Sequence, residues 1–276
     1  MKILVTGGAG FIGSNVVDAL VNKGNEVAVV DNLSTGKREN LNPKAKFYNI
    51  DIRDGNALKL VFQEFRPEVV YHFAAQIDVR KSVSDPSFDA EVNVVGSVNL
   101  FKLAADFGVK RIIFSSTGGA LYGYVNKIPA DEDTPIRPIC AYGVAKYCAE
   151  QYLDYFKRLY GIERVILRYA NVYGPRQDPL GEAGVVAIFT GRILRGEPIT
   201  IFGDGNQTRD YIFIEDVVSA NLLALNGKEG VYNIGTGIET SVNELVHIFE
   251  KLLGKKINPV YALKRQGEVD MIALDI

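Results

Sequence analysis

A glycine-rich loop near the start of the chain constrains the fold more than any other segment. The loop reads GGAGFIG at residues 7–13; it follows an apolar segment, Lys2–Thr6, and precedes a helical pattern at Phe11–Lys23. A second apolar segment, Glu26–Asp31, then ends on a carboxylate. Glycines at this spacing allow a tight turn and a close approach of the backbone to a pyrophosphate at the N-terminus of the helix. The segment therefore predicts a strand, a turn and a helix that bind a dinucleotide.

Apolar segments and helical patterns alternate up to Val172. The predicted strands are continuous apolar runs, which are typical of a parallel sheet covered on both faces. Further strands are expected at 46–50, 69–72, 111–115 and 164–168, with helices at 56–65, 86–107 and 141–160. The fold class is therefore α/β, a Rossmann-type doubly wound parallel sheet with a smaller α/β substrate-binding domain.

The regular alternation of strand and helix patterns ends at Val172, and a stretch rich in Gly and Pro follows. Helices are expected at 185–195, 216–225 and 240–253, and strands at 199–202, 231–234, 258–261 and in the last residues. The third helix has Thr240 or Ser241 as N-cap and Glu244 as capping-box partner. We expect a Rossmann domain at 1–172, which also receives roughly 212–253, and a substrate-binding domain at 173–211 and 254–276.

Composition excludes several classes of function. The formal net charge of −2 comes without a basic block, which argues against a nucleic-acid partner. No run has transmembrane length, so no membrane association and a cytoplasmic location are expected. Cys140 and Cys148 are expected to be unpaired packing residues. With only His72 and His247, no metal site is expected and acid/base work falls to other residues.

The predicted helix Ala141–Tyr160 begins with YGVAK, in which Tyr142 and Lys146 are four residues apart. Residues at this spacing share one helix face, so the ammonium group is expected to lower the pKa of the phenol. A decrease of roughly three units needs about 4 kcal/mol, which one lysine and a cationic cofactor ring could supply. The motif alone also fits an ordinary helix surface.

Other polar residues follow the predicted strands, where an open parallel sheet binds its ligand. Asp51-Ile52 and Phe73-Ala74-Ala75 are expected around the adenine, ribose and phosphates of the cofactor. A carboxylate at Asp31 can accept from both ribose hydroxyls and repels a 2′-phosphate, which favours NAD. Lys37 and Arg38 nearby keep NADP open.

Six segments together resemble the extended short-chain dehydrogenase/reductases, and among them the UDP-glucose (UDP-galactose) 4-epimerases. The segments are TGGAGFIG, DNLSTG, FSSTGGALYG, YGVAK, LRYANVYGPRQ and GDGNQTRDYIFIED. The resemblance runs from Met1 to Ile276, although the family continues into a further C-terminal segment that is not present here.

The resemblance implies a role for each matching residue. Tyr142 would be the catalytic acid/base, Lys146 its electrostatic partner and a ribose ligand, and Thr117 the hydroxyl residue that binds the sugar 4-hydroxyl. The cofactor residues would be Gly7, Gly10, Phe11, Ile12, Gly13, Asp31, Asn32, Ser34, Thr35, Gly36, Asp51, Ile52, Phe73, Ala74, Ala75, Gln76, Asn93, Ser115, Tyr142 and Lys146. The substrate residues would be Thr117, Tyr142, Asn171, Val185, Phe202, Arg209, Tyr211, Arg265 and Glu268.

The implied reaction is the reversible NAD-dependent epimerisation of a UDP-hexose at C4, UDP-galactose to UDP-glucose, through a 4-keto intermediate. Related dehydratases carry an acidic pair after the hydroxyl residue, and decarboxylases generally keep a Glu there; here the positions are Gly118 and Gly119. UDP-N-acetylhexosamine and UDP-glucuronate stay open as substrates, because Ile272, at the matching size gate, is intermediate in bulk. A non-catalytic dinucleotide sensor is disfavoured, since such proteins tend to lose the Tyr/Lys pair.

The resemblance also implies a homodimer formed through the helix after the fourth strand and the YGVAK helix. Ala104, Ala105, Ala145 and Ala149 could permit close packing between these two helices.

Overall fold

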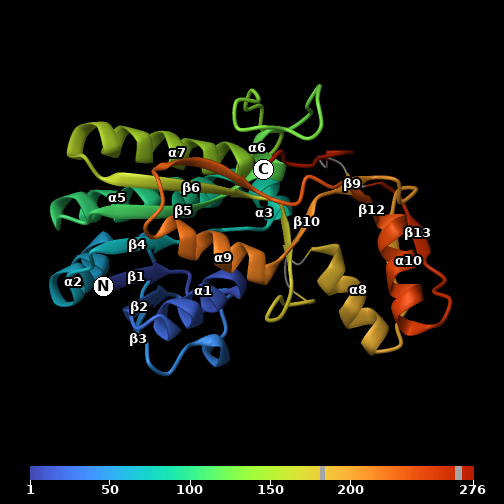
Figure 1. The fold of residues 1–276 in the computed structure, drawn as a ribbon, viewed down its shortest axis with the longest axis horizontal. Helices are drawn as coiled ribbons and strands as arrows, with labels where there is room; N and C mark the ends of the chain where they lie inside the picture. Colours follow the sequence, from blue (N-terminus) through green and yellow to red (C-terminus); the bar gives the residue numbers. More distant parts are fainter. Residues whose placement is uncertain (181–183, 265–268) are drawn as a thin grey trace.

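The computed structural model of the protein describes residues 1–180, 184–264 and 269–276, and a parallel sheet of seven strands forms its centre (Figure 1). In spatial order the strands are β11 (Gly230–Ile234), β6 (Glu163–Tyr169), β5 (Arg111–Thr117), β4 (Val69–His72), β1 (Lys2–Thr6), β2 (Glu26–Asp31) and β3 (Lys46–Asn49). Strand order reverses between β1 and β4, and ligands of such sheets bind beside the carboxyl ends at this point. The predicted parallel sheet is confirmed.

Helices cover both faces of the sheet because its strands are apolar on both sides. Leu4 packs into a core formed with α2 (Gly55–Phe65), α5 (Gly96–Asp106) and α7 (Ala141–Tyr160). Its neighbours Ile3 and Val5 pack instead into a core formed with α1 (Phe11–Asn22) and α9 (Ile214–Ala224). Successive side chains of a strand point to opposite faces, so a single apolar strand serves both cores.

The helical stretch predicted at 86–107 is confirmed, with a π-helical turn inside it. The segment forms α4 (Pro86–Ala90), a π-helical turn η2 (Glu91–Val95) and α5, and a further short helix, α3 (Val79–Ser84), precedes it. The turn brings Asn93 to 2% exposure. Gly96 follows directly, and a Cβ there would lie 2.7 Å from Ile52 Cδ1, so the helix packs closely on the segment after β3. Such π turns are frequent at functional sites.

The last third of the chain has a small core of its own. α8 (Val185–Leu194), β8 (Thr200–Phe202), α10 (Val242–Leu253) and β13 (Val260–Ala262) surround it, and Figure 1 shows α8, α10 and β13 at the end remote from α2. The core residues are Phe189, Ile199, Ile201, Val242 and Val246. The predicted capping box is confirmed, with Ser241 as the N-cap of α10 and Glu244 bonded in return.

Short two-stranded sheets connect this region to the central sheet. β7 (Asn171–Tyr173) pairs in parallel with β10 (Tyr211–Phe213), and β9 (Thr208–Arg209) pairs antiparallel with β12 (Thr240–Ser241). Instead of the expected final strand, the described C-terminal residues form one isolated bridge, between Ala130 and Leu274. The remaining short elements are η1 (Arg38–Asn40) and α6 (Gly118–Leu121).

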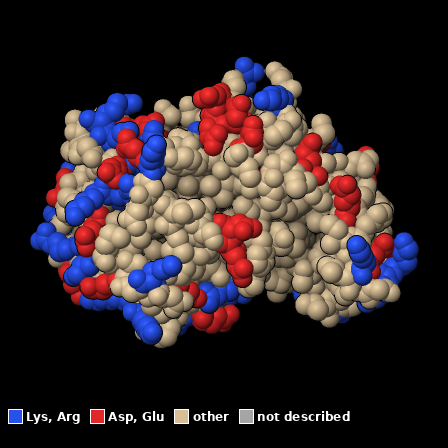
Figure 2. Space-filling view, in the orientation of Figure 1, with Lys and Arg blue, Asp and Glu red and all other residues tan. Residues whose placement is uncertain are grey.

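Charges are mixed on the face in Figure 2, where basic and acidic side chains alternate at the left end and uncharged residues fill much of the middle. Across the described ranges, no helix has both the length and the apolar character to cross a membrane. Cys140 and Cys148 are both free thiols, as predicted.

Candidate active site

The glycine loop at the end of β1 is shaped by backbone contacts that exclude side chains. Gly7 has φ +70°, and its amide donates to Val30 O at 2.8 Å. A Cβ on Gly13 would lie 2.2 Å from Gly7 O, and one on Gly7 would lie 2.5 Å from Ala74 N. The loop therefore folds tightly onto β2 and β4 only because these positions are glycine. Phe11 and Ile12, also predicted as cofactor residues, begin α1 immediately after it.

Asp31 closes β2 beside this loop with 8% of its surface exposed. Its oxygens accept from Ala9 N at 3.0 Å and from Leu33 N at 2.8 Å. Burial raises the pKa of the carboxyl group, while these two hydrogen bonds act in the opposite direction. Gly36 lies close by, since a Cβ there would be 2.9 Å from Asp31 Oδ1.

Lys37 and Arg38, the basic residues that left NADP as an alternative cofactor, contact other residues of the protein. Lys37 Nζ lies 3.1 Å from Asp178, and the Arg38 guanidinium lies over the ring of Phe47. Three further predicted cofactor residues, Asn32, Ser34 and Thr35, lie in the loop after β2. Asn32 donates to Asp51 Oδ2 at 2.9 Å, which ties this loop to the segment after β3.

Asp51 also pairs with Arg53 at 2.8 Å, and this hydrogen-bonded pair lowers the pKa of Asp51 to about 2. Ile52 beside it is 4% exposed and packs into the core that contains α2 and α5. Both predicted residues thus lie at the carboxyl edge, one as an ionised carboxylate and one as an apolar support.

A buried amide pair follows β4. Gln76 N donates to Asn93 Oδ1 and Asn93 Nδ2 donates to Gln76 O, both at 2.9 Å. Gln76 Nε2 and Asn93 Nδ2 also donate to Asp89 Oδ1, at 2.8 and 3.0 Å. Phe73, Ala74 and Ala75 lie between β4 and this pair. The π turn is what carries Asn93 to the predicted cofactor residues after β4.

The pair Tyr142 and Lys146 begins α7 beside the end of β5. Lys146 is 3% exposed, and its Nζ donates to Ser115 O at 2.7 Å and lies 4.6 Å from the ring centroid of Phe114. Thr117, two residues beyond Ser115, ends β5 and accepts from Ala120 N at 3.3 Å. β5 and α7 therefore bring the predicted catalytic residues to one corner of the sheet.

The expected lowering of the pKa of Tyr142 is wrong for the protein alone. Burial raises the pKa of the phenol well above its usual range, and Cys140 and Asp89 act in the same direction. Burial also lowers the pKa of Lys146 to about 8, although the carboxylates Glu150 and Asp89 oppose this. The main cause is desolvation, which disfavours the charged form of both groups.

The predicted substrate residues Asn171, Arg209 and Tyr211 meet where β7 pairs with β10. Asn171 lies opposite Tyr211 in this pairing, and its backbone N–H donates to Asp210 O at 2.9 Å. The Arg209 guanidinium donates to Thr208 O at 2.7 Å. Burial raises the pKa of Tyr211 to about 12, and no described residue bonds its hydroxyl group.

Four further predicted substrate residues belong to the last third of the chain. Val185 is the first residue of α8 and Phe202 the last residue of β8, and both are partly buried. Arg265 and Glu268 lie outside the described residues. A pocket of about 690 Å³ between α8 and α10 includes Tyr211 in its lining but none of the catalytic candidates, so we do not assign it to the reacting sugar.

Buried residues that the sequence does not single out connect the elements around the site. Asp210 is 1% exposed and accepts from Thr236 N at 2.9 Å, Thr236 Oγ1 at 2.6 Å, Gly237 N at 3.1 Å and Leu274 N at 3.3 Å. Glu150 and Arg168 form a buried ion pair with an N–O distance of 2.7 Å. Asp210 lies in the segment GDGNQTRDYIFIED and Glu150 in the predicted helix 141–160. Only their burial in the folded protein distinguishes them from surface carboxylates.

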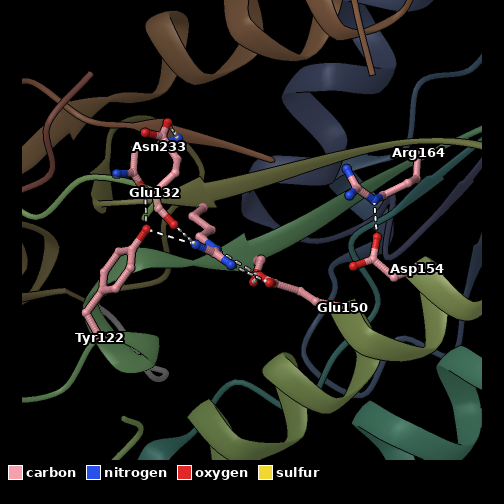
Figure 3. Close-up of polar contacts among 8 residues, drawn as sticks. Tyr122, Glu132, Glu150, Asp154, Arg164 and Asn233 are labelled. Carbon is pink, nitrogen blue, oxygen red and sulfur yellow. Dashed lines mark hydrogen bonds and ion pairs between the residues drawn. The ribbon is translucent and has the colours of Figure 1, made fainter. Parts of the chain in front are cut away.

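Figure 3 shows how this ion pair extends across the fold. Arg168 donates to the hydroxyl oxygen of Tyr122 at 3.0 Å, and Tyr122 donates to Asn233 Oδ1 at 2.8 Å. Asn233 N in turn donates to Glu132 Oε1 at 2.7 Å. The chain of contacts links α7, β6 and β11 to the segment between α6 and α7.

Comparison with known proteins is consistent with this architecture. The NAD dependent epimerase/dehydratase family matches residues 3–235. A putative UDP-glucose 4-epimerase of Methanocaldococcus jannaschii is 51% identical over 275 residues, which cover 99% of this chain and 90% of the relative.

Two solved structures are also similar over the whole chain. The UDP-glucose 4-epimerase of Thermotoga maritima, solved with UDP-glucose, is 54% identical with a TM-score of 0.98, and the match covers 100% of this chain and 90% of that chain. The UDP-glucose 4-epimerase of Thermus thermophilus, solved with NAD, is 46% identical with a TM-score of 0.95 at the same coverage. The chain therefore belongs to the NAD dependent epimerase/dehydratase family, in which it is similar to the UDP-glucose 4-epimerases in both sequence and fold.

Proposed function

We propose that the protein catalyses the reversible, NAD-dependent epimerisation of a UDP-hexose at C4, interconverting UDP-galactose and UDP-glucose. The observation that carries the proposal is the contact between α7 and β5: Lys146, four residues after Tyr142, donates to the backbone of Ser115, two residues before Thr117. The family match and the similarity to epimerases solved with UDP-glucose and with NAD support the same assignment.

The residues of this chain fit the proposed cofactor. The glycine loop leaves the backbone bare at the N-terminus of α1, where the helix dipole favours a phosphate. A Cβ at Gly13 would close this cradle, since it would lie 2.2 Å from Gly7 O. Asp31, at the end of the next strand, would hold the adenosine ribose, and the contacts of Lys37 and Arg38 elsewhere favour NAD over NADP.

In the proposed mechanism Tyr142 acts as the acid/base and Thr117 orients the sugar 4-hydroxyl. Bound NAD supplies reversible hydride transfer at C4. Tyr142 takes the proton of the 4-hydroxyl as the 4-keto sugar forms, and returns it when the opposite face of C4 is reduced. Asn171 and Arg209 would hold the diphosphate, for which a guanidinium fork is well suited. Since burial raises the pKa of Tyr142, the phenolate needs a positive charge close by.

The packing around Gly118 favours epimerisation over dehydration. A Cβ there would lie 2.5 Å from Leu274 Cδ1, so an acidic side chain would have to displace the buried Leu274 side chain. Gly119 has space for a side chain, but a glycine supplies no acid or base. Among the 4-epimerase substrates, UDP-N-acetylhexosamine and UDP-glucuronate stay as alternatives. Ile272 does not decide between them, because it is buried in a cluster with Tyr122, Ala130 and Leu274.

The experiment that tests the function is product analysis with the purified protein and its bound NAD. UDP-galactose is expected to give UDP-glucose, and the same equilibrium ratio is expected from the reverse direction. UDP-N-acetylgalactosamine and UDP-glucuronate are tested in parallel. If the protein holds NAD but leaves UDP-galactose unchanged, the assignment to this substrate fails.

Three broader assignments accompany this proposal. We place the protein in the cytoplasm and propose that it works as a homodimer. We also propose a Rossmann domain made of 1–172 with β10, α9 and β11, and a substrate domain made of the other described residues from 173 on. The helix α10, which the sequence analysis included in the first domain, is assigned to the second because Val242 and Val246 belong to its core.

A further inference from the structure

One buried carboxylate contacts both halves of the catalytic corner. Glu150 lies on α7 one turn after Lys146 and is 2% exposed. Its Oε1 accepts from Ser116 Oγ at 2.5 Å, and Ser116 lies between Ser115, which accepts from Lys146, and Thr117. Arg168 on β6 donates to the same carboxylate from Nε at 3.2 Å and from a terminal nitrogen at 2.7 Å. Glu150 therefore joins α7, β5 and β6 at one point.

We infer that Glu150 is a positioning residue of the proposed reaction: it fixes the turn of α7 that carries Lys146 against the end of β5 that carries Thr117, and it supplies negative charge that keeps Lys146 protonated. Glu150 touches neither the sugar nor the cofactor in this role. The inference rests on the proposed function only where it concerns turnover.

The inference has two halves, a positioning half (Glu150 fixes α7 against β5) and a charge half (Glu150 keeps Lys146 protonated). The positioning half follows from consecutive contacts along α7 and β5. Lys146 and Glu150 are four residues apart and share a face of α7, while Ser115 and Ser116 are adjacent on β5. One contact alone would let the helix slide along the strand. The two contacts, Lys146 to Ser115 O and Ser116 Oγ to Glu150, fix its register, and the bidentate bond from Arg168 fixes the orientation of the carboxylate.

The charge half follows from what surrounds Lys146. Glu150 on its own helix and Asp89 on α4 are the acidic groups that act on it, and both favour the ammonium form. His72 on β4 also faces it, but burial lowers the pKa of this imidazole to about 3, so it adds no charge. On the β5 side lie Ser115 O and the ring of Phe114. Without Glu150, Asp89 would be the one described carboxylate that still favours the charged form of Lys146.

The same two elements carry a matched control. Arg164 on β6 pairs with Asp154 on α7, four residues from Arg168 and Glu150 respectively, and Figure 3 shows both carboxylates on one helix. The side chains of this second pair are 15% and 28% exposed, against 6% and 2% for the first. A variant that removes the Arg164–Asp154 pair therefore shows what the loss of an α7–β6 ion pair does when nothing changes beside Lys146.

The charge half is measured without reference to activity, by NMR titration of the ε-carbon signal of Lys146, identified by its absence in Lys146→Met. The wild-type midpoint is expected near 8. Glu150→Gln is expected to move it down by about one pH unit, because an adjacent opposite charge shifts a pKa by this order. Asp154→Asn should leave it in place. An unchanged midpoint in Glu150→Gln, or an equal shift in Asp154→Asn, overturns this half.

The positioning half is measured as turnover of UDP-galactose once wild-type turnover is established. Ser116→Ala keeps the ion pair and removes the link to β5, so kcat is expected to fall roughly ten-fold while the Lys146 midpoint stays in place. Glu150→Gln is expected to lose activity first on the alkaline side of the pH profile. Wild-type kcat in Ser116→Ala overturns this half.

A further variant guards against misfolding, because Glu150→Gln leaves the Arg168 guanidinium buried without its counter-ion. Glu150→Gln combined with Arg168→Gln removes both charges and is expected to fold. Its Lys146 midpoint should still lie below that of the wild type, and a midpoint at or above the wild-type value contradicts the inference.

Discussion

At the scale of single residues, the proposed chemistry depends on two groups, Tyr142 and Lys146, whose buried surroundings favour their neutral forms. Burial raises the pKa of Tyr142 and lowers that of Lys146, so the protein alone favours the neutral phenol and only marginally the ammonium. Active sites commonly shift pKa values in this way, and the groups work only when a further charge arrives. Ionisation of Tyr142 therefore requires a positive charge beside the phenol.

Replacement of the tyrosine tests its assigned role. Tyr142→Phe removes the hydroxyl group and keeps the ring, so NAD content and thermal stability should stay close to wild type. Turnover of UDP-galactose should fall by about 10²-fold or more, because general acid/base catalysis contributes on this order. Product formation and bound NAD are measured on the same preparation. Activity within a few-fold of wild type would remove Tyr142 from the mechanism.

A second residue-scale prediction concerns the glycine cradle. Gly13→Ala places a Cβ 2.2 Å from Gly7 O, so the loop has to open and NAD content should be lost. Gly55→Ala is the matched control, since its Cβ has no neighbour closer than 3.8 Å and its stability should change by less than about 0.5 kcal/mol. NAD released on denaturation is quantified for both proteins. Full NAD content in Gly13→Ala contradicts the assignment of the cradle.

The residues that can be predicted from sequence are those whose role is local. The glycine loop, Asp31 and the YGVAK pair belong to short motifs with a fixed spacing, so the sequence points to them before their distant contacts are known. Glu150 and Asp210 cannot be selected in this way, since the partners of each carboxylate come from two segments that are distant from it in the sequence. The effect of burial on Tyr142 escapes prediction for the same reason: desolvation is a property of the packed corner.

At the scale of elements, the ends of helices follow from the sequence more readily than their interruptions. α7 has its predicted bounds, because Gly161 follows it with φ +73° and terminates it. The π turn at Glu91–Val95 adds a residue to one turn without breaking the apolar pattern, so the sequence resembles that of one long helix. The small paired strands β9 and β12 have two residues each, too few to show any alternation.

Asp210 provides the element-scale prediction, because it fastens the end of β9 and the start of β10 to the loop after β11 and to the C-terminal segment. Asp210→Ala leaves the amides of Thr236, Gly237 and the buried Leu274 without their acceptor, and should cost about 3 kcal/mol or more. Asp204→Ala, in the same GDGNQTRD segment but exposed, should cost below about 1 kcal/mol. Urea unfolding of both variants measures the difference, and equal losses would show that these contacts of Asp210 are unimportant.

At the scale of the whole molecule, the outer face of α7 carries a row of exposed apolar side chains. Val144, Tyr152, Tyr155 and Leu159 recur at helical spacing along it and are 41–55% exposed. The alanines expected to allow close packing lie elsewhere: Ala104 and Ala149 are fully buried and pack inside one copy of the chain. Apolar stripes of this kind mark interaction surfaces, and the proposed homodimer would place two such faces together.

The dimer prediction follows from this surface. Tyr155→Glu introduces a carboxylate at the middle of the stripe, where burial against a second copy would be costly, so the variant should be monomeric. Leu60→Glu, on α2 with the native side chain 65% exposed, is the control and should keep the wild-type mass. Light scattering coupled to gel filtration measures both, and thermal unfolding checks that the fold is kept. A monomeric wild type, or a dimeric Tyr155→Glu variant, would exclude this face as the interface, because a charge on an uncovered surface changes neither association nor mass.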